Sequence, residues 1–167
     1  MAALISFLIF CQALGACIGV CMTMWGEFAY VCAMRDKKLD TAERTHLHFI
    51  AHGLRFGMTL LLLASFSLVI IAYVLHESLQ PAVTASYWIF IIFALLTIGI
   101  SWALSRRRIS FALGSAAVLT AWWLLFYLTF GLLPVRSFGS AVALYAVLTA
   151  VVYAALHYIR LLALHKE

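Results

Sequence analysis

Five long apolar runs, separated by short polar stretches, constrain this chain more than any other feature of its sequence. Each run reaches the roughly 18–20 residues that a helix needs to cross the hydrocarbon core of a bilayer. The runs lack the alternation of apolar and polar residues that is typical of spanning β-strands. A composition that is 66% hydrophobic leaves too little polar surface for a soluble fold. The sequence therefore predicts an all-α bundle of five transmembrane helices in a single domain, 1–167, with helices at about 4–31, 49–75, 87–104, 109–133 and 138–162.

Basic residues are concentrated in alternate loops. The first loop carries Arg35, Lys37, Lys38 and Arg44, the third carries Arg106, Arg107 and Arg108, and the C-terminal tail carries Arg160 and Lys166. The second loop has no Lys or Arg, and the fourth has only Arg136. The positive-inside rule then places the N-terminus outside and the C-terminus in the cytoplasm. We expect a multi-pass protein of the bacterial cytoplasmic (inner) membrane, and no nucleic-acid partner, because the basic residues flank membrane spans.

Four ionisable residues inside the runs are the main indications of function: Glu27, His52, Arg55 and His157. Each lies one to two turns from the cytoplasmic end of its helix, so three helices present ionisable groups at one depth. A charge at the membrane centre costs about 2.5–3.5 kcal/mol, so such residues usually have partners. We therefore expect Glu27 to pair with Arg55, with the two histidines adjacent.

The helical period of 100° per residue predicts which side chains share a face. Three stripes of small or polar residues result, and we expect each to face the bundle interior. They are Gln12, Gly15, Gly19, Thr23, Gly26 and Tyr30, with Glu27 at the edge, on the first helix; His48, His52, Arg55, Thr59 and Tyr73 on the second; and Gly139, Ala143, Ala146, Ala150, Tyr153 and His157 on the fifth. GxxxG motifs at Gly15–Gly19 and Gly53–Gly57 predict close approach between helices.

Two histidines at matched depth on different helices can supply both axial ligands of a b-type haem. His52 and His157 are the candidates, Arg55 suits a propionate, and Glu27 completes the site. Small residues on the facing helices would leave room for the ring. The alternative is a polar cluster that only holds the helices together; a proton or ion pathway and metal transport also remain open.

A metal site is a further possibility, with His48, His52 and His157 as candidate ligands. His48 and His52 have the i, i+4 spacing that can chelate a metal on one helix face. The residues between them include no glutamate, so a zinc protease of the HExxH type is not expected. Copper would draw on soft sulfur ligands. These are Met22, Met24 and Met58 and the cysteines Cys11, Cys17, Cys21 and Cys32.

The segment from Gln12 to Leu63 resembles small bacterial membrane proteins of the CopD-like group. A glycine-rich first helix ends near an acidic residue, and a short charged loop, RDKKLDTAE, leads into the second helix. The group is associated with copper handling and is similar to a haem-binding membrane family of late haem synthesis. Its members often carry a histidine in the first helix where this chain has Gln12, so this chain has lost that ligand or uses His52 and His157 instead.

Three hypotheses follow. The chain is a b-haem protein that moves electrons, a copper or proton-coupled transporter, or a structural or accessory subunit of a larger membrane complex. The sequence contains no credible Ser-His-Asp set and no phosphate-binding glycine loop, so any redox chemistry would belong to a bound cofactor. At this size, we expect a homo-oligomer or partner membrane subunits beside the lipid bilayer.

Overall fold

The computed structural model describes residues 2–36, 41–75, 84–106, 108–133 and 137–165, with side chains described for 3–32, 49–75, 84–106, 108–133 and 137–162. Within these ranges the chain forms five helices: α1 (Ala2–Asp36), α2 (Thr41–Val74), α3 (Ala85–Ser105), α4 (Phe111–Thr129) and α5 (Phe138–His165). All five are long and apolar enough to cross a membrane. The predicted fold class, an all-α bundle of five transmembrane helices, is confirmed.

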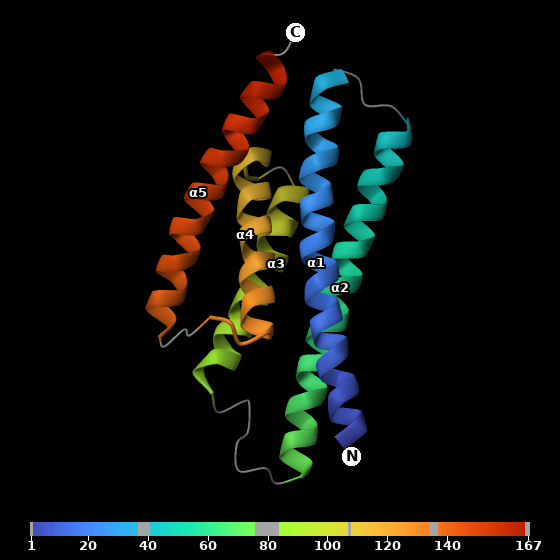
Figure 1. Cartoon of the computed structure of the whole chain (residues 1–167), viewed down its shortest axis with the longest axis vertical. Helices are drawn as coiled ribbons and strands as arrows, with labels where there is room; N and C mark the ends of the chain where they lie inside the picture. The colour runs from blue at the N-terminus through green and yellow to red at the C-terminus, as the bar shows by residue number, and fades with distance from the viewer. Residues whose placement is uncertain (1, 37–40, 76–83, 107, 134–136, 166–167) are drawn as a thin grey trace.

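Successive helices alternate in direction, so the C-terminal ends of α1, α3 and α5 point toward the same end of the bundle (Figure 1). α1 and α2 form a long antiparallel pair with the most extensive packing in the molecule. α4 packs against α1, α3 and α5, whereas α2 packs almost entirely on α1. The molecule therefore consists of a hairpin, α1–α2, joined through α1 to a group of three helices around α4.

Glycines allow α1 and α2 to approach closely. A Cβ on Gly15 would lie 2.8 Å from the carbonyl oxygen of Gly57 and 2.9 Å from the backbone nitrogen of Leu61. A Cβ on Gly57 would in turn lie 3.0 Å from the carbonyl oxygen of Gly15. The two backbones are thus in direct contact, as small residues permit in membrane helices. The close approach predicted from the GxxxG motifs is confirmed at this crossing.

α4 is the most buried of the five spans, and it carries the largest fully buried side chain, Trp122. The indole is 1% exposed and occupies the space beside Gly19 of α1, where any Cβ would overlap the ring. On the other side, the hydroxyl of Tyr145 in α5 donates to the carbonyl oxygen of Ala117, at 3.2 Å. α4 therefore packs between α1 and α5, which contact each other only slightly.

The ends of the helices differ from the apolar runs for local reasons. α4 ends at Thr129 rather than near Leu133 because Gly131 takes a positive φ of 65°. The Gly131 and Leu132 amides donate back to the carbonyls of Leu128 and Tyr127, which is the Schellman pattern of a helix end. α1 and α2 continue past their apolar runs because polar residues are compatible with helix outside the membrane.

Candidate functional site

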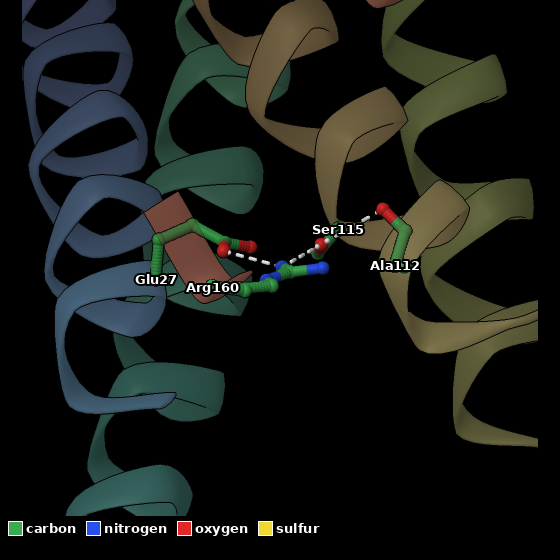
Figure 2. Close-up of polar contacts among 4 residues, drawn as sticks. All are labelled: Glu27, Ala112, Ser115 and Arg160. Atoms are coloured by element: carbon green, nitrogen blue, oxygen red, sulfur yellow. Dashed lines mark hydrogen bonds and ion pairs between the residues drawn. The ribbon is translucent and has the colours of Figure 1, made fainter. Parts of the chain in front are cut away.

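The described residues contain one buried ionic cluster, which we call the Arg160 cluster: Glu27 and Tyr30 of α1, Phe111 and Ser115 of α4, and Arg160 of α5. One terminal nitrogen, Nη2 of Arg160, donates to Oε2 of Glu27 at 2.7 Å and to Oγ of Ser115 at 2.9 Å (Figure 2). The Arg160 and Glu27 side chains are 8% and 12% exposed. Three helices are thus joined by a single guanidinium.

Two aromatic rings complete the surroundings of this guanidinium. The Arg160 Cζ atom lies 5.0 Å from the centre of the Tyr30 ring and 5.6 Å from that of Phe111. The rings also contact each other, with centroids 4.1 Å apart. A cation over an aromatic face is attracted by the ring quadrupole, and more strongly where water is excluded. The cluster therefore combines an ion pair, a hydrogen bond and cation–π contacts.

Helical spacing explains how these side chains meet. Glu27 and Tyr30 are three residues apart, and Phe111 and Ser115 are four apart, so each pair shares a face of its helix. Arg160 lies on the α5 face that packs against α4, together with Ala141, Tyr145 and Leu156. Ser115 in addition donates its hydroxyl to the carbonyl of Ala112, at 3.3 Å, so its oxygen is fixed for the guanidinium.

The predicted pair between Glu27 and Arg55 is wrong. The Glu27 carboxylate binds Arg160, and Arg55 lies on the exposed side of α2, away from α1. The described part of the chain offers Arg55 no ion pair; Thr59 donates only to the Arg55 backbone carbonyl, at 2.9 Å. The prediction failed because Gly53 and Gly57, on the opposite side of α2, are the residues that contact α1.

The two histidines proposed as axial ligands lie on helices that do not pack on each other. His52 is exposed on α2, which packs on α1, and His157 is exposed on α5, which packs mainly on α4. α1 stands between α5 and α2 in the view of Figure 1. The His157 ring is stacked on that of Tyr153, with an interplanar angle of 6°. The structure thus brings Glu27 to Arg160, and leaves His52, Arg55 and His157 outside that cluster.

The candidate metal ligands are likewise dispersed. The side chain of His48 lies outside the described residues. Among the side chains that are described, no group of three or more His, Cys, Asp or Glu is placed to hold a metal ion. Cys11 and Cys17 are half-buried and Cys21 and Cys32 are exposed, all as free thiols. Copper binding therefore stays a prediction from the sequence.

The stripe predicted to face inward is interior in α1 but not in α2 or α5. In α1, Gly15, Gly19 and Thr23 are buried, as predicted. In α5 the small residues lie on the outer surface, and we call them the α5 small-residue face: Gly139, Ala143, Ala146 and Ala150. His157 follows on the same exposed face. The prediction for α5 is wrong because the bulkier side of the helix, with Tyr145 and Arg160, is the side that contacts α4.

Comparison of the chain with family models, with curated proteins and with solved structures finds no match. The likeness to the CopD-like group therefore stays a prediction that rests on residues 12–63 alone. What the fold defines is the class: a multi-pass membrane protein of five apolar helices with a buried ionic cluster.

Proposed function

We propose that the chain is a structural or accessory subunit of a larger membrane complex, and that it contacts its partner through the α5 small-residue face. The proposal places it in the bacterial inner membrane with the N-terminus outside and the C-terminus cytoplasmic, as its loop charges favour. It assigns no side-chain catalysis to the chain. The observation that carries it is the exposure of Gly139, Ala143, Ala146 and Ala150 along one side of α5.

Small residues on a membrane helix favour contact with another helix rather than with lipid. Lipid tails are as apolar as leucine, so helices associate chiefly where small side chains let their backbones approach. The spacings Gly139–Ala143 and Ala146–Ala150 are both of this small-xxx-small type. Inside the molecule the same device joins α1 to α2. No described helix of this chain covers the α5 small-residue face, which supports a second chain as its partner.

The internal polar residues support a structural role as well. Glu27, the only acidic residue in any of the five spans, is already bound to Arg160, and Ser115 is bound to the same nitrogen. The ion pair joins α1 to α5, and Ser115 links α4 to the same nitrogen. A transport path through the bundle would use Thr23 and Glu27, yet the Thr23 hydroxyl donates to carbonyls of its own helix, at 2.8 and 3.0 Å.

The test compares two substitutions on neighbouring positions of α5. Ala150→Leu adds bulk to the small-residue face, whereas Val151→Leu adds bulk to an exposed position about 100° away. The mass of the complex extracted from native membranes in mild detergent is measured for each. We expect a mass above that of the single chain, lost with Ala150→Leu and kept with Val151→Leu. A monomer in the wild type, or equal effects of both variants, would contradict the proposal.

A b-type haem at this face is the second candidate, and the position of His157 favours it. The imidazole is exposed at the end of the small-residue face, where small side chains leave room for a ring. Because His52 is on a helix that does not pack on α5, the second axial ligand would come from the partner. A reduced-minus-oxidised visible spectrum of the complex tests this: a sharp α-band lost in His157→Ala but kept in His52→Ala supports it, and a colourless complex from haem-replete cells rejects it.

A further inference from the structure

A second exposed surface is independent of α5 and carries a charge. We call it the α2 polar face: His52, Arg55 and Thr59, which share one side of α2 opposite the glycines that contact α1. All three are exposed, although they lie within the second apolar span. An unpaired arginine inside a membrane is costly, so an arginine that remains there has found an anion or reaches the headgroups.

The depth of Arg55 in the span fits a guanidinium that reaches the headgroups. Arg55 lies six residues beyond Phe49, where the span begins, so its Cα is about 9 Å inside the apolar zone. Side chains on a helix tilt toward its N-terminus, which for α2 is the nearer membrane surface. The long stem of arginine can extend in that direction and bring the guanidinium to the depth of lipid phosphates. His52 lies three residues nearer that surface and shares this exposed face of α2.

The spans of a second copy offer no free anion for Arg55. Glu27 is the only acidic residue in any of the five spans, and its carboxylate is buried against Arg160. A homodimer through α2 would instead oppose two arginines. The membrane itself offers phosphate groups at the required depth, and anionic lipids are attracted to basic residues there.

The surface beyond Arg55 suits an acyl chain. Toward the membrane centre the same side of α2 continues with exposed apolar side chains: Phe56 (60% exposed), Leu63 (61%) and Phe66 (48%). A cation at headgroup depth, followed by an apolar stripe deeper in the membrane, matches the phosphate and the acyl chain of a phospholipid. We propose that the α2 polar face binds one anionic phospholipid of the leaflet where α2 begins, with Arg55 and His52 on the phosphate.

The test measures lipid binding by the full chain in detergent. Phosphatidylglycerol and phosphatidylcholine are titrated separately, and bound lipid is counted by native mass spectrometry for the wild type, Arg55→Gln and Arg55→Lys. We expect Arg55→Gln to weaken phosphatidylglycerol binding roughly five-fold, the loss of one basic contact, with Arg55→Lys between the two. Phosphatidylcholine binding is expected to be weaker and to change little. Arg106→Gln is the matched control, since Arg106 is an exposed arginine that follows the C-terminal end of α3 and lies over Trp102.

Three results would overturn the proposal. The first is equal binding of phosphatidylglycerol by Arg55→Gln and the wild type, or an equal loss in Arg106→Gln. The second is protection from thermal unfolding by inorganic phosphate that equals the protection by phosphatidylglycerol, which would indicate a phosphate site rather than a lipid site. The third is a protein chain or a haem found at α2 that excludes the lipid. The α5 partner is untouched by any of these results, because the two faces belong to different helices.

Discussion

Two arginines inside the apolar spans have opposite surroundings. Arg160 is 7% exposed and is held by Glu27, Ser115 and the rings of the Arg160 cluster. Arg55 is exposed on α2, on the side opposite the glycines that contact α1. A buried guanidinium without a counter-charge is costly, whereas one that reaches the membrane surface is not. Substitutions at the two positions should therefore have different effects on folding.

Replacement of Glu27 by glutamine tests the buried pair. The variant keeps the size of the side chain but leaves Arg160 without its counter-charge, so we expect the free energy of unfolding to fall by about 3 kcal/mol. Unfolding in mixed micelles with a denaturing detergent, followed by tryptophan fluorescence, measures the change.

Two comparisons make this result interpretable. Arg55→Gln removes an exposed charge and should change the free energy of unfolding by less than about 0.5 kcal/mol. Glu27→Gln combined with Arg160→Gln should cost less than the sum of the single changes, because the residues interact directly. A Glu27→Gln variant as stable as the wild type would show that the pair contributes nothing to the fold.

The sequence identified Glu27 but not its partner, and the reason is geometric. Helical periodicity predicts which residues share a face, whereas pairing also requires knowledge of which helices are neighbours. Arg160 is only two residues from the end of its span, so the sequence groups it with the basic residues that set orientation, whereas Arg55 is six residues inside its span and is the predicted partner. Arg160 shares a face of α5 with Tyr145 and Leu156, and this face contacts α4. The sequence predicts the shared face, but it indicates Arg160 as the partner of Glu27 only when the contact between α5 and α4 is known.

At the scale of helices, small residues decide how closely two elements approach. Gly15, Gly19 and Gly57 bring α1 against α2 and make room for Trp122 of α4. The stripe on α1 was correctly predicted to be interior because a central helix is covered on several sides. The stripes on α2 and α5 were not, because an outer helix of a bundle has one covered side and the sequence pattern alone does not say which.

Gly19→Ala tests the contact between α1 and α4. The added methyl would overlap the buried indole of Trp122, which is enclosed and cannot move aside freely. Such overpacking typically costs about 1–3 kcal/mol. We therefore expect Gly19→Ala to lower the measured unfolding temperature.

Gly99→Ala is the matched control for this substitution. Gly99 lies within α3, and a Cβ there would have no neighbour within 4 Å. Since alanine favours helix over glycine by up to about 1 kcal/mol, Gly99→Ala should be neutral or stabilising. Similar losses of stability in both variants would mean that glycine matters here through the helix backbone and not through Trp122.

At the scale of the whole molecule, the bundle is asymmetric: one hairpin, α1–α2, stands against three helices around α4 (Figure 1). Its two outermost helices carry the features that the interior does not use, the α2 polar face and the α5 small-residue face. The number of helices and the all-α class could be predicted from hydropathy. A segment that crosses the hydrocarbon core as a helix needs about 20 apolar residues, and its backbone groups have to be hydrogen-bonded internally. The outward-facing surfaces depend on helix neighbours and could not be derived in the same way.

The orientation proposed for this bundle rests on the loop charges. Fusion of a fluorescent protein that matures only in the cytoplasm to the C-terminus tests it. We expect fluorescence, because the basic first and third loops and the C-terminal tail are all expected on the cytoplasmic side. An exported fusion without fluorescence would contradict the proposed orientation and would indicate the opposite topology for all five helices.

Site-specific photo-crosslinking at Ala150 tests most directly the central claim, that α5 is an interface with another membrane protein. A photoreactive amino acid is placed at Ala150 or, as the control, at Val151, and the chain is irradiated in its native membrane. The account predicts one adduct of discrete mass from Ala150, to a second copy or to one other chain, and only lipid adducts from Val151. Lipid adducts alone from Ala150, at the yield found for Val151, would contradict it.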